Sequence, residues 1–317
     1  MNQPLLQVRD LRVGFGRQAV LRDISFELFS GETVALVGES GSGKSTLARA
    51  ILSLVQPTQG SVQFMGVDLL RSPGPVLRAQ RRNLQIVFQD PLASLNPRMT
   101  VGDAIAEPLK IFEPQLNPAE RRQRVAAMLE RVGLSAGLAG RYPHEFSGGQ
   151  CQRIAIARAM VLHPKLLICD EAVSSLDVSI QGQIINLLLD LQRDVGMTML
   201  FISHNLAVVR QLSHRVMVMY LGRLVEIASS DSLFIAPVHP YTRALLAAVP
   251  QIPPVAAAAP LVEGSFAAGS SVSGCAFRER CPYALPLCAS SDPPLTELVG
   301  AHWVACHRSH EPLNPLS

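Results

Sequence analysis

The chain has 317 residues and carries 28 Lys and Arg against 25 Asp and Glu, which gives a formal net charge of +3. This charge is too small to indicate nucleic-acid binding, and a hydrophobic content of 48% excludes a disordered chain. No stretch approaches the ~20 consecutive apolar residues of a membrane-spanning helix, and Met1–Asp10 lacks the basic start and apolar core of a signal peptide. We therefore expect a cytoplasmic protein with one large domain and a smaller appendage.

Apolar runs without polar alternation predict strands that are buried on both faces of a sheet. These runs lie at Thr33–Val37, Leu84–Phe88, Leu166–Cys169, Met199–Ile202 and Val216–Tyr220. Helical patterns separate them, and this alternation predicts an α/β domain.

Two of the predicted helices are interpreted as packing elements only. The first begins at Asn117-Pro118, where Glu120 completes a capping box, and it ends at Gly133. The second covers Ile180–Leu191 and has one apolar face.

The composition changes from about Pro237 onward. Pro250–Pro260 is rich in proline and alanine, Gly264–Gly274 is rich in glycine and serine, and a cluster of cysteines follows. These features predict a main domain over residues 1–235 and a small, loop-rich module over residues 236–317.

A glycine-rich segment follows the first buried strand and precedes a helical pattern. It consists of Gly38, Glu39, Ser40, Gly41, Ser42, Gly43, Lys44, Ser45 and Thr46. This spacing in this context predicts a P-loop, whose backbone N–H groups surround phosphate oxygens. The helix N-terminus adds partial positive charge, Lys44 contacts the outer phosphates, and the Ser45 hydroxyl ligates Mg²⁺.

Two adjacent acids, Asp170 and Glu171, come directly after the strand Leu166–Cys169. A P-loop protein needs an acid at the end of a neighbouring strand to hold magnesium, and Asp170 supplies it. Glu171 is then placed to polarise the attacking water as a general base.

A second anion-binding pattern stands twenty residues before the acids, at Phe146-Ser147-Gly148-Gly149-Gln150. It opens a helix predicted from about Gln152 to Leu162. Exposed amides, a hydroxyl and the helix dipole make such a helix start an anion site. Because one nucleotide does not use both sites within one chain, we expect two chains to share two nucleotides.

This set of motifs resembles the ATP-binding-cassette (ABC) ATPases over about Gln7–Leu233, with Phe146–Gln150 as the family's signature sequence. The resemblance implies a P-loop ATPase with a mixed-sheet core and a helical subdomain. It also implies that Phe15 stacks on adenine and that Gln89 touches Mg²⁺ and the attacking water. Asp177 would lie at the dimer seam, and His204 would contact the γ-phosphate.

A narrower resemblance points to the oligopeptide, dipeptide and nickel importers. Phe88–Arg98 and Asp170–Asp177 are similar to that branch, and His239–Leu246 matches the start of its C-terminal extension. Ala172-Val173 replaces the Pro-Thr of many cassettes, as in one of the two ATPase subunits of this branch, which implies a heterodimer. Cys151 departs from the longer polar residue that is common after the signature.

The remaining cysteines form a cluster, Cys275, Cys281, Cys288 and Cys306, whereas Cys151 and Cys169 are expected as buried core thiols. Disulfides do not suit a reducing cytoplasm, and the short knuckles of zinc sites are absent. The wider spacing matches neither common ferredoxin pattern. The importer resemblance favours a [4Fe–4S] cluster, and zinc or reduced thiols are the alternatives.

The resulting prediction is an ATP- and Mg²⁺-dependent ATPase subunit of an importer, with di- or oligopeptides as the cargo implied by the resemblance. Its implied partners are a second ATPase subunit, two integral-membrane permeases contacted through Gln89–Arg98, and an extracytoplasmic solute-binding protein. The implied location is the cytoplasmic face of the inner (plasma) membrane, without nucleic acid.

The alternative is a soluble ABC ATPase that acts on nucleic acid or ribosomes. No heptad run lies between Lys44 and Ser147, and the chain has one cassette, so this alternative is disfavoured. A regulatory module without turnover is disfavoured because Glu171 and His204 are present.

Overall fold

Two groups of chain segments form separate units in the computed structural model, which describes residues 3–16, 18–174, 176–248 and 273–311. The first unit contains Leu28–Glu32 and Phe64–Ile202, and the second contains Leu6–Glu27, Thr33–Gln63 and the described residues from Ser203 onward. The segment Pro250–Pro260, rich in proline and alanine, and most of Gly264–Gly274 lie outside the described residues.

The first unit is built on three parallel strands. β7 (Leu166–Asp170) pairs with β6 (Leu84–Val87) on one side and with β8 (Thr198–Ile202) on the other. All side chains of β7 and β8 are buried, as expected for apolar runs covered on both faces.

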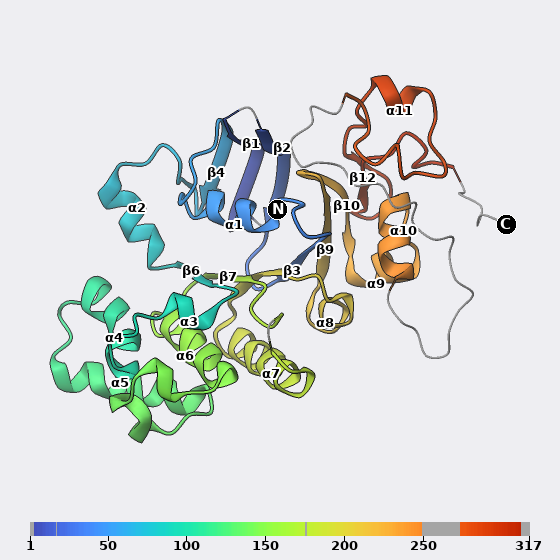
Figure 1. Ribbon diagram of the computed structural model, residues 1–317. Helices are drawn as coiled ribbons and strands as arrows, with labels where there is room; N and C mark the ends of the chain where they lie inside the picture. The colour runs from blue at the N-terminus through green and yellow to red at the C-terminus, as the bar shows by residue number, and fades with distance from the viewer. Residues whose placement is uncertain (1–2, 17, 175, 249–272, 312–317) are drawn as a thin grey trace. The chain divides into compact units, whose positions relative to one another are not determined.

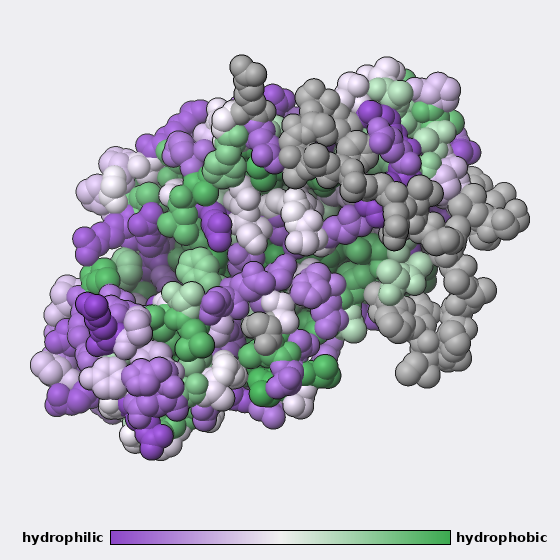
Figure 2. Space-filling model, viewed as in Figure 1, coloured by the Kyte–Doolittle hydropathy of each residue, from purple (hydrophilic) through white to green (hydrophobic). Residues whose placement is uncertain are grey.

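Helices make up the rest of the first unit, together with the short strand β5 (Val67–Asp68). They are α2 (Gly74–Arg81), α3 (Pro91–Ser94), α4 (Val101–Phe112), α5 (Pro118–Arg131), η1 (Ala136–Gly140), η2 (Pro143–Glu145), α6 (Gly148–Met160) and α7 (Val178–Val195). α4, α5 and α6 pack on one another in the green part of Figure 1. Their outer surface is mostly hydrophilic in Figure 2.

Helix α5 begins as the sequence predicts. The Asn117 side chain accepts hydrogen bonds from the N–H groups of Ala119 and Glu120, at 2.9 and 3.0 Å. The Glu120 carboxylate in turn accepts from the Asn117 N–H at 2.7 Å, which completes the capping box.

The second unit contains a parallel strand pair that continues into an antiparallel ladder. β3 (Thr33–Val37) pairs in parallel with β9 (Arg215–Tyr220), β9 pairs antiparallel with β10 (Arg223–Ser229), and β10 pairs antiparallel with β12 (Trp303–Val304). The other elements are β1 (Leu6–Phe15), β2 (Gln18–Leu28), α1 (Lys44–Ile51), β4 (Gln59–Phe64), α8 (Leu206–Leu212), α9 (Ser230–Ile235), α10 (Pro240–Ala247), α11 (Leu287–Ser290) and β11 (Thr296–Glu297).

Residues of the predicted C-terminal module share a hydrophobic core with the strands before it. Tyr241 on α10 and Phe277 are almost fully buried beside Val37 of β3 and Val218 and Tyr220 of β9. The described residues of the module therefore pack as part of the second unit, and the boundary at 235/236 stays a prediction from composition.

A buried carboxylate ties this module to β10. Glu226 is fully buried and accepts hydrogen bonds from the Val238 and His239 N–H groups, at 2.8 and 3.0 Å. The His302 ring also contacts the Glu226 carboxylate, with Nε2 at 2.7 Å. Burial strongly raises the pKa of Glu226, but these hydrogen bonds outweigh it and leave the pKa below its ordinary value.

The five predicted strands are confirmed to within one residue at each end. The predicted start of the signature helix near Gln152 is wrong, because α6 begins at Gly148 with Ser147 as its N-cap. In the described part of the chain, no helix has the length and apolarity to cross a membrane.

Glu226→Gln should lower the free energy of unfolding by roughly 2–3 kcal/mol, because a neutral amide cannot accept all three hydrogen bonds. A carboxylate with a lowered folded-state pKa stabilises the fold above its unfolded pKa, and this contribution is lost as the pH falls through the folded value. The difference in melting temperature between wild type and variant should therefore be full at pH 7 and shrink below about pH 4. Thermal unfolding at several pH values measures this difference, with Glu297→Gln, a substitution of an exposed residue, as control. Equal melting temperatures for wild type and Glu226→Gln at pH 7 would contradict the role of Glu226.

Candidate functional site

The P-loop connects β3 to α1 and has a backbone that requires glycine. Gly38, Gly41 and Gly43 have φ angles of 153°, 77° and 106°. A Cβ at Gly38 would stand 2.1 Å from the Met219 carbonyl oxygen, so no side chain fits there. Gly43 is the N-cap of α1, and the loop thus ends at a helix N-terminus, as a phosphate site requires.

Lys44 points into its own loop. Its buried ammonium donates to the carbonyl oxygens of Gly38 and Glu39, both at 2.8 Å, and lies 3.5 Å from the Ser42 hydroxyl. The Ser42 carbonyl accepts from the N–H of Gly222, in the turn between β9 and β10. The loop therefore combines the glycines, the helix N-terminus and the buried cation that a phosphate-binding loop requires.

The other loop residues lie where the motif places them. Ser45 and Thr46 occupy the first turn of α1 and are half-buried, while Ser40 is exposed.

The parallel pairing of β6 and β7 brings Gln89 and Glu171 together in the first unit. Val87 pairs with Cys169, and each functional side chain follows two residues later at the same sheet edge. The Gln89 amide donates to the Glu171 carboxylate at 3.3 Å. Asp170, the last residue of β7, is almost fully buried.

Glu171 has a strained backbone. Its φ of 49° lies in the left-handed region, which costs a non-glycine residue about 1–3 kcal/mol. The Glu171 N–H donates to the Ile202 carbonyl, and the Glu171 carbonyl accepts from the Ser174 N–H and hydroxyl. Such held strain is typical of residues whose side chain must point into a site.

The signature segment forms the N-terminus of α6. Ser147 accepts from the Gln150 N–H at 3.4 Å, and the Gln150 side chain accepts from the Ser147 N–H at 3.0 Å. A Cβ at Gly149 would meet Ile180 at 2.7 Å, whereas Gly148 has more space. Cys151 is buried and donates to the Pro143 carbonyl, so the predicted buried thiol is confirmed, as it is for Cys169.

Three further predicted residues are accessible. Asp177 is exposed at the N-cap of α7, and its neighbour Val178 is 84% exposed. His204 is exposed just before α8, and Phe15 is 55% exposed at the end of β1. Phe15 is thus not a core aromatic, and its ring is available for stacking.

The four clustered cysteines line one small cavity, together with Phe277, His307 and other side chains. Burial raises the pKa values of Cys275 and Cys281 to about 11. Among the described residues, no group of three or more His, Cys, Asp or Glu is arranged to hold a metal ion. The arrangement of the four cysteines in the structure therefore does not support the predicted ligation of a metal cluster.

Sequence reasoning missed three residues that contact the motifs. Tyr241 and Arg280 both hydrogen-bond to Glu39 of the P-loop. Arg158 on α6 donates to the Ser94 carbonyl on α3 at 2.6 Å. No local pattern marks them, because their partners lie 64 or more residues away.

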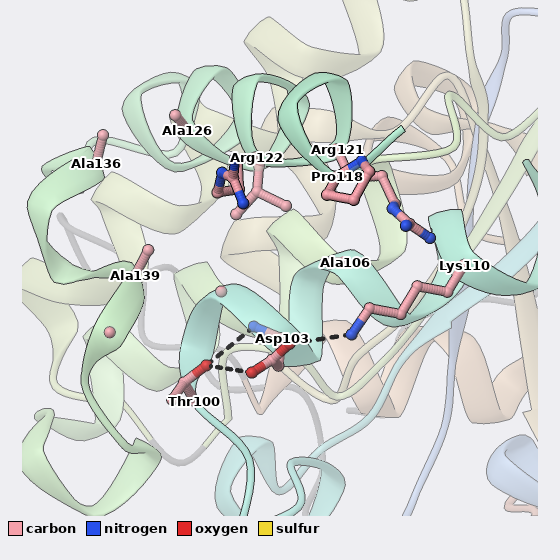
Figure 3. Close-up of a pocket in the computed structure, with 13 residues that line it drawn as sticks. Thr100, Asp103, Ala106, Lys110, Pro118, Arg121, Arg122, Ala126, Ala136 and Ala139 are labelled. Carbon is pink, nitrogen blue, oxygen red and sulfur yellow. Dashed lines mark hydrogen bonds and ion pairs between the residues drawn. The ribbon is translucent and has the colours of Figure 1, made fainter. Parts of the chain in front are cut away.

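A larger cavity, of about 520 Å³, lies between α4, α5 and η1 (Figure 3). At its edge, Thr100 and Lys110 both hydrogen-bond to Asp103, and Arg121 and Arg122 of α5 also line the cavity. Its lining in the described chain includes none of the predicted site residues. The nucleotide motifs, not this cavity, mark the candidate site.

Comparisons with known proteins agree with these motifs. Residues 21–174 match the family described as ABC transporter, and residues 225–288 match the oligopeptide/dipeptide transporter C-terminal region. The oligopeptide transport ATP-binding protein OppF of Escherichia coli is 50% identical over 95% of both chains. A putative peptide import ATP-binding protein of Brucella ovis is 48% identical over 97% of this chain and 98% of its own.

Solved structures show the same fold. CbiO1 from Clostridium perfringens, part of the ABC transporter complex cbiONQ, superposes with a TM-score of 0.67 at 29% identity, over 74% of this chain and 92% of its own. A dimeric ATP-binding cassette in a post-hydrolysis state with ADP and Pi gives a TM-score of 0.65 at 28% identity, over 71% of this chain and 98% of its own.

The fold and the motifs define a P-loop ATPase of the ABC type, with a mixed sheet and a C-terminal extension. The chain belongs to the ABC transporter ATP-binding proteins of the oligopeptide/dipeptide family. The predicted recognition, fold and ATPase function in an ABC importer are confirmed, which favours the transporter over the soluble alternative.

Glu171→Gln should abolish most ATP hydrolysis while leaving ATP binding intact, because the amide cannot take a proton from water. A general base contributes about 10²–10⁴-fold to such a rate. Phosphate release by the assembled transporter measures the loss, with Glu107→Gln, an exposed acid on α4, as control. Near-normal turnover in the Glu171→Gln variant would show that Glu171 is not the general base.

Proposed function

We propose that this chain is one of two ATPase subunits that power the import of di- or oligopeptides from the cytoplasmic face of the inner (plasma) membrane. The main support is the match of residues 225–288 to the C-terminal region of oligopeptide/dipeptide transporters. The relatives named above, which are peptide transport or import proteins by name, support the same cargo class. Nickel, other metal chelates and sugars are the competing cargoes.

In this proposal, the P-loop amides and Lys44 bind the phosphates of ATP. Ser45 and Asp170, with Gln89, hold Mg²⁺, which stabilises the developing charge on the transferred phosphoryl group. Glu171 receives the proton of the attacking water, and its hydrogen bond to Gln89 supports this pairing of base and magnesium ligand.

Each signature helix start completes the site of a second ATPase subunit. Ser147, Gly148, Gly149 and Gln150 meet the γ-phosphate bound to the other subunit's P-loop. His204 contacts the γ-phosphate bound to the P-loop of its own chain. The exposed Val178 beside Asp177 suits a seam that closes against another protein surface. The second subunit is a distinct chain, as the Ala172-Val173 sequence implies.

The permease contact is the segment Gln89–Arg98. Leu92 on α3 is 51% exposed, and Arg98 is exposed after it, so this segment offers one apolar and one charged anchor. The hydrogen bond from Arg158 to Ser94 joins α3 to α6, the helix that begins with the signature. Movement at the permease contact can thus reach the signature through packed elements.

The four cysteines are proposed to hold a [4Fe–4S] cluster. Each sulfur accepts a hydrogen bond from a backbone N–H, donated by Phe277, Tyr283, Leu285 and Arg308 respectively. Arg278, Arg308 and His307 line the same cavity and can offset the negative charge of four thiolates. Hydrogen bonds to sulfur and nearby charge are the usual means of tuning such clusters.

The chain purified without oxygen should contain iron and acid-labile sulfide in equal amounts. Cys281→Ser or Cys306→Ser should remove most of both, because each loses one thiolate ligand, whereas Cys151→Ser, outside the cluster, should retain them. Metal and sulfide analysis measures this. Zinc without sulfide would establish the zinc alternative. The absence of both iron and zinc would show that the four cysteines are free thiols.

The transporter assignment is tested by purifying Glu171→Gln protein from native membranes in ATP and Mg²⁺ and identifying its partners by mass spectrometry. Two integral-membrane chains and a second ATPase subunit are expected, and the permeases indicate the cargo. Ribosomal proteins or nucleic acid without a membrane chain would contradict the importer.

Arg98→Glu, made in the same Glu171→Gln protein, should reduce recovery of the permeases by roughly tenfold, since reversing a charge at an interface costs several kcal/mol at most. Nucleotide binding should not change. Arg193→Glu, an exposed arginine on α7, is the matched control. Unchanged recovery with Arg98→Glu places the permease contact elsewhere.

A further inference from the structure

Every polar group of Glu39 in the P-loop is engaged. Its N–H donates to the Tyr241 hydroxyl at 2.9 Å, and its carbonyl accepts from the Lys44 ammonium at 2.8 Å. Its carboxylate accepts from both terminal nitrogens of Arg280, each at 3.0 Å. Tyr241 and Arg280 belong to the C-terminal extension, so two of the three contacts come from outside the nucleotide motifs.

Arg280 is itself held in a fixed position. Its side chain is only 11% exposed, and its guanidinium carbon lies 5.8 Å from the ring centres of both Tyr220 and Phe277. Those two rings pack edge to face at 5.3 Å, and Tyr241 packs on both of them. A planar guanidinium in such a setting is preorganised for a two-point contact with a carboxylate.

We propose that Arg280 is a positioning residue of the nucleotide site, which fixes the P-loop through Glu39 and neutralises the Glu39 carboxylate. The C-terminal extension thereby sets the affinity of this subunit for ATP. This inference goes beyond the proposed function and depends neither on the peptide cargo nor on what the cysteines hold.

Two physical effects of removing Arg280 both lower the affinity for ATP. Without Arg280, a bare carboxylate remains in the loop that receives a highly charged anion, and like charges repel. The loop also loses its two-point anchor, so more conformational entropy is lost when ATP orders it. Both effects weaken ATP binding when Arg280 is removed.

The coupling between ATP binding and the order of the C-terminal extension is reciprocal. Arg280 is followed directly by Cys281, so the anchor of the P-loop is continuous with the wall of the cysteine cavity. If the extension favours ATP binding, then bound ATP favours the ordered extension by the same factor.

The test compares Arg280→Ala in two backgrounds, wild type and Glu39→Gln, by calorimetric titration of the full chain with Mg-ATP. In the wild-type background, Arg280→Ala should raise the Kd roughly fivefold. In the Glu39→Gln background, the same substitution should change the Kd less than twofold, because there is no carboxylate to neutralise. Arg280→Lys keeps the charge and should recover part of the affinity.

Asp292→Ala is the matched control, since Asp292 is the extension's partner in an ion pair with Arg223 of β10. It should lower the melting temperature without changing the Kd. Equal loss of affinity in both backgrounds, or no loss in either, would overturn the proposal. If Arg280→Ala does not fold, Arg280→Lys and Arg280→Gln in both backgrounds decide the same question.

Discussion

The parallel pairing of mostly buried strands is the constraint on which the candidate site depends. The middle residues of these covered strands are mostly apolar, so the side chains that can act on a ligand lie at or just beyond the strand ends. In the first unit, the register of β6 and β7 brings Gln89 within hydrogen-bond distance of Glu171. In the second unit, β3 ends in the P-loop, and its neighbour β9 supplies the Met219 carbonyl that makes glycine necessary at position 38.

Features set by neighbours in sequence could be predicted. Buried strands follow from unbroken apolar runs, and the capping box at Asn117 and Glu120 follows from a three-residue spacing. The start of α6 was missed because glycines at positions 148 and 149 favour a loop, whereas the reciprocal hydrogen bonds of Ser147 and Gln150 are strong enough to begin the helix there.

Features set by tertiary contacts could not be predicted. Arg280 and Glu39 are 241 residues apart, and no periodicity relates them. The exposure of Phe15 could not be predicted either, because it depends on which tertiary neighbours cover the end of β1. Glu226 lies among the apolar residues Leu224, Val225, Ile227 and Ala228 of β10, and no sequence pattern predicts that three groups of the C-terminal module surround it.

These contacts change the physical meaning of the C-terminal extension. Composition separates residues 236–317 from the cassette, yet β12 extends the ladder of β10, and Phe277 fills the core beside Tyr220. A chain that ended at residue 235 would expose that core and leave Glu39 without its counter-charge. The Glu39 carboxylate lies in a phosphate-binding loop, and Arg280, held against the rings of Tyr220 and Phe277, supplies its counter-charge. The extension therefore completes the electrostatics of the nucleotide site in addition to covering the sheet.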